Sequence, residues 1–193
     1  RGRSDAEAKE ICDAHTEKIM QTDAASFVYG IDVGTIENAV VKALHESHLT
    51  LSAAESCTGG MFISKLIDFP GTSEIIGASF ITYSDEAKIK SVGVNPETIK
   101  NYGVVSENTA LEMAVGAMNT AKSDIGVGIT GFAGPFDNDD DPDAGRVCFG
   151  FSVKVKTVTS TKRFGNIGRN AVRELSVIYA VDTLIKLINT FGV

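Results

Sequence analysis

The stretch Ala54–Gly60, which reads AESCTGG, places several chemically capable side chains at one turn of the chain. An apolar run precedes it and two glycines close it, so we expect a strand that ends near Ser56 and a helix that begins at the glycines. The N-terminus of a helix offers backbone N–H groups that can bind an anion or an oxyanion. The alternative is an ordinary strand-to-helix turn, in which Ser56 or Thr58 only caps the helix. The Gly-x4-Gly-Lys spacing of a nucleotide phosphate loop is missing.

Two further polar clusters follow predicted strands: Tyr83–Lys88 reads YSDEAK, and Gly128–Pro135 reads GITGFAGP. Tyr83 would end a strand and Lys88 would lie a little over one helical turn later, so both could face one edge of the sheet. The glycine-rich stretch would let the backbone approach a ligand closely. Taken singly, the simpler interpretation of each cluster is a capped helix with an exposed lysine, or a tight turn. A nicotinamide-dependent redox enzyme is excluded, because its Tyr-x3-Lys spacing is one residue shorter and no Gly-x-Gly-x-x-Gly follows an early strand.

A serine nucleophile at position 56 requires a base. His15 and His45 fall on predicted helices, which makes them poor candidates. His48 begins the strand whose far end holds Ser56, which places the two roughly 25 Å apart in an extended chain. Lys88 remains, and it must be neutral to accept a proton, which requires burial or a neighbouring cation.

Two neighbouring residues have other possible roles. Tyr83 could relay the proton or hold Lys88 in place. Cys57 is the rival nucleophile, but it is adjacent to Ser56, so only one of the two is expected to face the ligand. We rank Cys57 lower, because no histidine is placed to generate its thiolate.

Periodicity predicts an α/β fold with a mixed sheet flanked by helices, in three layers. The predicted helices cover 5–20, 35–48, 58–69, 84–93, part of 95–103, 106–121 and 168–188. The predicted strands cover 49–55, 73–83 and 123–131, and two paired strands lie within 146–164. The order of these elements brings the ends of the first three strands, and with them the three polar clusters, toward one edge of the sheet.

Composition and charge limit the kinds of partner and the cellular setting that we expect for this protein. The 193 residues carry a net charge of −7 without a concentrated basic patch, which excludes nucleic acid as a partner. No apolar run approaches the roughly 20 residues of a membrane span, and the start of the sequence has no apolar signal-peptide core. The three cysteines show no paired spacing, so we expect no disulfide framework, no metal site and a reducing, cytoplasmic setting. The acidic run 137–145 predicts a solvated loop and lacks the closing Glu of a calcium loop.

Four motifs together resemble the CinA C-terminal domain family, the nicotinamide mononucleotide deamidases: AESCTGG, YSDEAK, GVVSENTALEMAVGA and TGFAGP. The resemblance covers about Thr35 to Ile188. It implies an amidohydrolase domain over 35–193, with 1–34 as an N-terminal helical extension that is part of the same domain or flexible. It further implies conversion of nicotinamide mononucleotide to nicotinate mononucleotide and ammonia, without cofactor or metal. A homodimer is the expected assembly.

The resemblance also assigns roles to individual residues. Ser56 is implied as the nucleophile, Tyr83 and Lys88 as the proton-transfer pair, and Ser73 as an assisting residue. Arg169 is implied near the substrate phosphate. The remaining positions implied to bind substrate are Glu55, Thr58, Gly59, Gly60, Thr130, Gly131, Ala133 and Gly134. Amides around Thr58–Gly60 would stabilise the oxyanion.

The stretch after TGFAGP departs from the family pattern. Glycines give way to Asp137, Asp139, Asp140 and Asp141, and acids near a phosphate oppose its binding. Two alternatives therefore stay open: an amidase for another small amide, and a non-catalytic module that binds a nucleotide or a protein partner.

Overall fold

The structure is a computed structural model that describes residues 4–29, 31–138 and 141–191. The helices are α1 (Asp5–Met20), α2 (Ile36–Glu46), α3 (Met61–Ile67), α4 (Asp85–Val92), α5 (Pro96–Tyr102), α6 (Glu107–Ala121) and α7 (Arg169–Phe191), with short 3₁₀ turns η1 (Asp23–Phe27) and η2 (Thr72–Glu74). The strands are β1 (Leu51–Glu55), β2 (Ile76–Ile81), β3 (Ile125–Gly131), β4 (Arg146–Val153) and β5 (Lys156–Arg163).

The strands form one mixed sheet in the order β2-β1-β3-β4-β5. β1 runs parallel to both β2 and β3, whereas β3–β4 and β4–β5 are antiparallel pairs. Helical crossovers produce the parallel pairs and a hairpin produces the last antiparallel pair. The prediction of an α/β fold with a mixed sheet is therefore confirmed, and β1 lies inside the sheet with strands on both sides.

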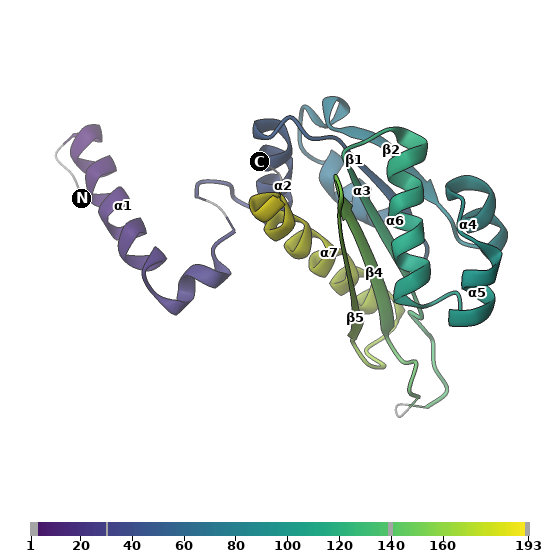
Figure 1. The fold of residues 1–193 in the computed structure, drawn as a ribbon. Coiled ribbons are helices and arrows are strands. Elements are labelled where there is room, and N and C mark those ends of the chain that lie inside the picture. The colour runs from purple at the N-terminus through teal and green to yellow at the C-terminus, as the bar shows by residue number, and fades with distance from the viewer. Residues whose placement is uncertain (1–3, 30, 139–140, 192–193) are drawn as a thin grey trace.

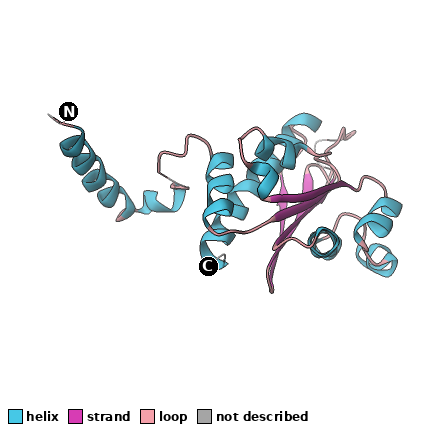
Figure 2. Ribbon diagram, turned by 90° about the horizontal axis from the view of Figure 1, so that it is seen from above, coloured by secondary structure: helices cyan, strands magenta, loops and turns pink. Residues whose placement is uncertain are grey.

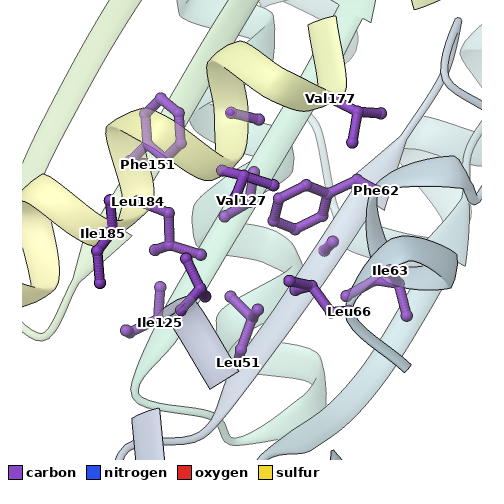
Figure 3. Close-up of a cluster of buried hydrophobic side chains, with 14 of the residues drawn as sticks. Leu51, Phe62, Ile63, Leu66, Ile125, Val127, Phe151, Val177, Leu184 and Ile185 are labelled. Atoms are coloured by element: carbon purple, nitrogen blue, oxygen red, sulfur yellow. The ribbon is translucent and has the colours of Figure 1, made fainter. Parts of the chain in front are cut away.

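Helices cover both faces of the sheet (Figures 1 and 2). α2, α3 and α7 pack on one face, where a cluster of apolar side chains fills the space between helices and strands (Figure 3). Phe62 and Leu66 of α3 and Leu184 of α7 meet Leu51 and Val127 there, and all five are 0% exposed. Burial of each such side chain contributes about 1.5–3 kcal/mol, which anchors α3 and α7 to the strands that lead to the polar clusters.

α6 packs against the opposite face at unusually short distance, because glycines replace side chains beneath it. A Cβ at Gly126 would lie 2.0 Å from the Ala114 carbonyl oxygen, and one at Gly150 would lie 2.3 Å from the Ala110 carbonyl oxygen. Any side chain at these positions would collide with the α6 backbone. The glycine-rich character of the predicted strand 123–131 thus reflects helix packing as well as the turn that follows it.

The same close packing recurs between α4 and α6, and it makes a prediction about Gly116. Ala normally stabilises a helix relative to Gly by about 0.5–1 kcal/mol. A Cβ at Gly116, however, would lie 1.7 Å from the Val92 carbonyl oxygen. We expect Gly116→Ala to lower the free energy of unfolding by about 2–3 kcal/mol, measured by urea denaturation. Gly77→Ala is the control, because its Cβ would lie no closer than 3.2 Å to any neighbour, with the Ser52 hydroxyl at 3.2 Å, the Ala121 side chain at 3.5 Å and the Leu51 carbonyl at 3.7 Å. An unchanged midpoint for Gly116→Ala would contradict the close α4–α6 contact.

The N-terminal segment differs from the rest of the molecule. α1 forms over the predicted residues 5–20, is capped by the Ser4 side chain and has no buried residue. Both ribbon views draw it apart from the sheet and its covering helices (Figures 1 and 2). Among the residues described, no helix combines the length and apolar character that crossing a membrane requires.

Candidate active site

The carboxyl end of β1 is the centre of the candidate site. Glu55, the last residue of β1, lies opposite Ile81 of β2 and Ile129 of β3. Ser56 follows directly, and its amide donates to the Ile129 carbonyl at 2.9 Å, which fixes the first residue beyond the strand. Ser56 is 8% exposed. The three predicted polar clusters therefore meet at one edge of the sheet, as parallel strands dictate.

Glu55, which the resemblance implies as a substrate-binding residue, instead orients its neighbours. Its carboxylate is fully buried and accepts hydrogen bonds from the amides of Gly60 at 3.0 Å, Phe62 at 3.1 Å and Ile63 at 3.2 Å. A strand residue thus caps the N-terminus of the following helix, because its carboxylate accepts hydrogen bonds from amides that would otherwise be unpaired. Glu55 positions α3, and it does not line the cavity described below.

The expectation that amides around Gly59 and Gly60 would bind an oxyanion is wrong for these two glycines. The Gly59 amide donates to the Ser56 carbonyl at 3.1 Å, and the Gly60 amide is held by Glu55. The expected capping role of Thr58 is also wrong, because Gly60 is the N-cap of α3 and makes no side-chain cap. The Thr58 hydroxyl is buried without a hydrogen-bond partner among the described residues.

Lys88 reaches Ser56 from α4. The helix begins at Asp85, with the Ser84 hydroxyl accepting from the Ala87 amide. The Lys88 side chain is 0% exposed, so the alternative of a solvated lysine is excluded. Its Nζ lies 3.3 Å from Ser56 Oγ.

Main-chain carbonyls of the β2–α4 connection hold the amine of Lys88. Nζ donates to the Thr82 carbonyl at 2.9 Å and to the Tyr83 carbonyl at 3.4 Å. Burial lowers the pKa of Lys88 below its usual value of 10.5, and the carboxylate of Asp85 only partly opposes this effect. A buried amine with a lowered pKa, beside a serine hydroxyl, is suited to accept a proton.

A cavity of about 190 Å³ opens beside Ser56 and Lys88. Val104, Val105 and Phe132 form its apolar wall, whereas Asp85 and Arg169 contribute charge. The other lining residues are Ser56, Cys57, Tyr83, Lys88, Thr130 and Gly131. A cavity lined by both apolar side chains and polar groups is suited to a ring that bears a polar substituent.

Arg169 joins two parts of the site from the first turn of α7. It donates to the Gly134 carbonyl at 2.7 Å and to the Tyr83 hydroxyl at 3.0 Å. Tyr83, 63% exposed, thus contacts Arg169 through its side-chain hydroxyl, whereas its contact with Lys88 is made by its main-chain carbonyl. Ala133, within the predicted loop, is buried.

Two of the candidate catalytic residues, Ser73 and Cys57, are not suited to the roles considered for them. Ser73 belongs to η2, which precedes β2 at the opposite edge of the sheet, and the structure does not bring it to Ser56. Cys57 lines the cavity, but burial raises the pKa of its thiol to about 12. A thiol with so high a pKa is a poor source of thiolate at neutral pH, which agrees with its lower rank as a nucleophile.

The acidic run forms a loop before β4, in which Asp139 and Asp140 lie outside the described residues. Asp137 is exposed, and Asp143 forms an ion pair with Arg146 at 2.7 Å. Arg146 also donates to the Val105 carbonyl at 2.8 Å and lies over the Phe132 ring, so it supports the apolar wall from outside. At least part of the acidic charge is therefore compensated locally.

Arg173 is a residue of the site that sequence reasoning missed. It donates to the Cys57 carbonyl at 3.0 Å and to the Thr58 carbonyl at 3.1 Å. The available signal was its position one helical turn after Arg169, which places both arginines on one face of α7. Within the described residues, no group of three or more His, Cys, Asp or Glu side chains is arranged to hold a metal ion.

The chain is similar in sequence to known proteins of one family. Residues 33–188 match the profile described as the CinA C-terminal domain. A CinA-like protein of Kosmotoga olearia is 38% identical over 180 residues, which cover 92% of this chain and 43% of the relative. A CinA-like protein of Fusobacterium nucleatum is 42% identical over 167 residues, which cover 86% of this chain and 40% of the relative. The chain thus spans less than half the length of these relatives.

Solved structures show the same fold. The competence/damage inducible protein CihA from Agrobacterium tumefaciens superimposes with a TM-score of 0.76 at 32% identity, covering 83% of this chain and 98% of the other. A competence-damaged protein (CinA) superfamily protein from Escherichia coli gives a TM-score of 0.74 at 37% identity, covering 83% of this chain and 94% of the other.

Proposed function

The chain belongs to the CinA C-terminal domain family, and on that premise we propose that it is an amidohydrolase that converts nicotinamide mononucleotide to nicotinate mononucleotide and ammonia. The observation that carries the proposal is the buried amine of Lys88, 3.3 Å from the hydroxyl of Ser56. A buried lysine that forms no ion pair with a carboxylate lowers the stability of the fold, and a role in proton transfer explains why such a residue is present.

The hydrogen bonds of Lys88 orient a neutral amine for this chemistry. A neutral amine has two hydrogens and one lone pair. If the two hydrogens are donated to the Thr82 and Tyr83 carbonyls, the lone pair is left for the Ser56 hydroxyl. Ser56 Oγ then attacks the carboxamide carbon as its proton moves to Lys88. The same proton passes to the departing nitrogen, which leaves as ammonia, and water hydrolyses the ester on Ser56 to the carboxylate.

The cavity walls suit the reacting part of this substrate. Val104, Val105 and Phe132 provide an apolar surface for the pyridine ring. Arg169 stands at the same cavity with an exposed guanidinium, and its two hydrogen bonds to neutral oxygens leave further N–H donors for a phosphate. The contacts of Tyr83 support the other of its two expected roles, that of holding Lys88 in place, because its main-chain carbonyl accepts from Lys88 Nζ while its hydroxyl accepts from Arg169.

A smaller amide is the second candidate, and the size of the cavity favours it. The volume of about 190 Å³ is below the roughly 300–1,000 Å³ of typical ligand pockets, so a nucleotide would have to extend outside it. Asp85 at the cavity and the exposed Asp137 add negative charge, which opposes binding of a substrate phosphate. Turnover of nicotinamide mononucleotide, free nicotinamide and acetamide under identical conditions separates the two candidates, since turnover of the nucleotide alone would exclude the smaller substrate.

The test of the function is ammonia release by the wild-type chain beside Ser56→Ala. We expect the wild type to release ammonia and Ser56→Ala to lose at least about a thousandfold in kcat/KM, because the nucleophile is gone. Ammonia release that survives Ser56→Ala would refute the mechanism. Calorimetric binding of the nucleotide without turnover would instead favour a binding module.

A further inference from the structure

We propose that Arg173 is a positioning residue that holds the turn after Ser56 so that the Cys57 and Thr58 amides form the oxyanion site. The inference rests on the proposed amidohydrolase function and identifies a part of the site that the sequence motifs did not assign. The amides first expected for this task were those around Thr58–Gly60. The Gly59 and Gly60 amides are already committed to Ser56 and Glu55, which leaves that of Thr58.

The contacts of Arg173 explain how it acts. Nε donates to the Cys57 carbonyl at 3.0 Å and Nη2 donates to the Thr58 carbonyl at 3.1 Å, while Nη1 contacts Asn170 Oδ1 at 3.2 Å. The planar guanidinium thus binds two successive carbonyls, which fixes the Cys57–Thr58 and Thr58–Gly59 peptide planes and with them the amides of Thr58 and Gly59. The Gly59 amide in turn donates to the Ser56 carbonyl at 3.1 Å, and this bond holds the Ser56–Cys57 plane that carries the Cys57 amide. A single point charge such as a lysine amine cannot impose this geometry.

The direction of the amides follows from the carbonyls. Gly134–Pro135 is the only cis peptide bond in the described chain, so the Cys57–Thr58 peptide is trans, and its N–H points opposite to its carbonyl. With the Cys57 carbonyl drawn toward Arg173, the Thr58 amide faces the other side of the turn. The Thr58 amide lies near the Cys57 thiol, and Cys57 is one of the residues that line the cavity, so that side of the turn faces the cavity.

The environment of the Cys57 thiol agrees with this direction of the amides. The backbone amides of Cys57 and Thr58 both act to lower the pKa of this thiol, although burial outweighs them. Both amides therefore lie near the Cys57 sulfur, and Cys57 lines the cavity. An oxyanion formed on attack by Ser56 would lie next to the amide of the following residue, as in other hydrolases with a nucleophile at a strand-to-helix turn.

α7 provides a rigid base for this device. Val172, Ser176 and Val177 are buried on either side of Arg173 in the chain, which fixes the helix against the core. Arg169, one turn earlier, holds the Tyr83 hydroxyl and the Gly134 carbonyl. One face of α7 therefore holds the loops that follow all three parallel strands of the site.

An oxyanion site acts on the transition state more than on the bound substrate, so kcat should respond and KM should not. We expect Arg173→Ala to lower kcat for ammonia release about a hundredfold with KM within about threefold. Arg173→Lys should retain the fold, and its kcat should lie between those of the wild type and Arg173→Ala. Millimolar guanidinium chloride should restore part of the kcat of Arg173→Ala. Glu174→Gln, an exposed neighbour on α7, is the matched control and should behave like wild type.

The outcomes separate this inference from the function on which it rests. If Ser56→Ala loses turnover but both Arg173 variants keep the wild-type kcat, or raise only KM, Arg173 does not support an oxyanion site and the inference is overturned alone. If the wild type releases no ammonia, or Ser56→Ala remains active, the proposed function falls and this inference falls with it. Thermal unfolding of each variant identifies a loss caused by misfolding, in which case the Arg173→Lys kcat and the guanidinium rescue decide.

Discussion

Lys88→Met is expected to abolish ammonia release and at the same time to make the protein more stable. The variant removes the only amine within reach of Ser56 in the described chain, so kcat/KM should fall by at least about a thousandfold. Met has a similar length and no polar atom to bury, so it should fill the 0% exposed site without the cost of a buried amine. Loss of activity with a gain in stability distinguishes a functional lysine from a structural one.

The pH dependence of both quantities should follow the lowered pKa of Lys88. Between that folded-state pKa and the 10.5 of an ordinary lysine, the unfolded chain binds more protons than the folded one, so wild-type stability rises with pH across this window. The stability gain of Lys88→Met should therefore be largest below the folded-state pKa and shrink as the pH approaches 10.5. Wild-type kcat/KM should rise with pH and level off above the same lowered pKa, because the neutral amine is the base.

Lys90→Met is the matched control for this prediction. Lys90 lies on the same helix but is exposed, so its loss should leave ammonia release unchanged and should not stabilise the chain. Urea denaturation at several pH values and a pH profile of initial rates give the two measurements. A Lys88→Met variant with more than a tenth of wild-type kcat/KM would show that another group takes the proton from Ser56.

The serine and the lysine could be predicted because each follows a parallel strand at the same edge of the sheet. Strand ends are visible in the sequence as a change from apolar residues to Gly, Ser and Asp, and the α/β topology then brings them together. The assisting role of Ser73 has another origin, because only the family resemblance implies it. Ser73 lies in η2 (Thr72–Glu74), before β2 and at the opposite end of the strands, a strand length of roughly 15–20 Å from Ser56.

The supporting residues could not be predicted, because their partners are backbone atoms. Arg173 contacts carbonyls 115 and 116 positions earlier in the chain, and a carbonyl leaves no trace in the sequence. Likewise, periodicity predicts that strands and helices alternate, but it does not order them. That β1 lies between β2 and β3 is seen only in the folded chain.

Glu55 is the strongest case of a residue whose sequence context suggested ligand binding and whose geometry gives it a structural task. Glu55→Ala should lower the free energy of unfolding by about 3–5 kcal/mol, because the amides of Gly60, Phe62 and Ile63 lose their acceptor near the core. Glu55→Gln should cost about 2–4 kcal/mol, since its amide group presents one oxygen and two hydrogens to a cluster of donors. Urea denaturation measures both values.

A second capping carboxylate provides the contrast that makes this prediction specific. Glu112 accepts from the Asn95 amide at 2.7 Å and from the Thr98 hydroxyl at 2.5 Å, but it is only half-buried and lies away from the cavity. Glu112→Gln should cost no more than about 1 kcal/mol and should leave ammonia release unchanged. Glu55→Gln should lower kcat as well, even at temperatures where it is fully folded, because Ser56 is the next residue and the turn that Arg173 grips ends at α3. A Glu55→Gln variant with wild-type stability and a raised KM alone would mean that this carboxylate binds substrate, as the sequence motif first suggested.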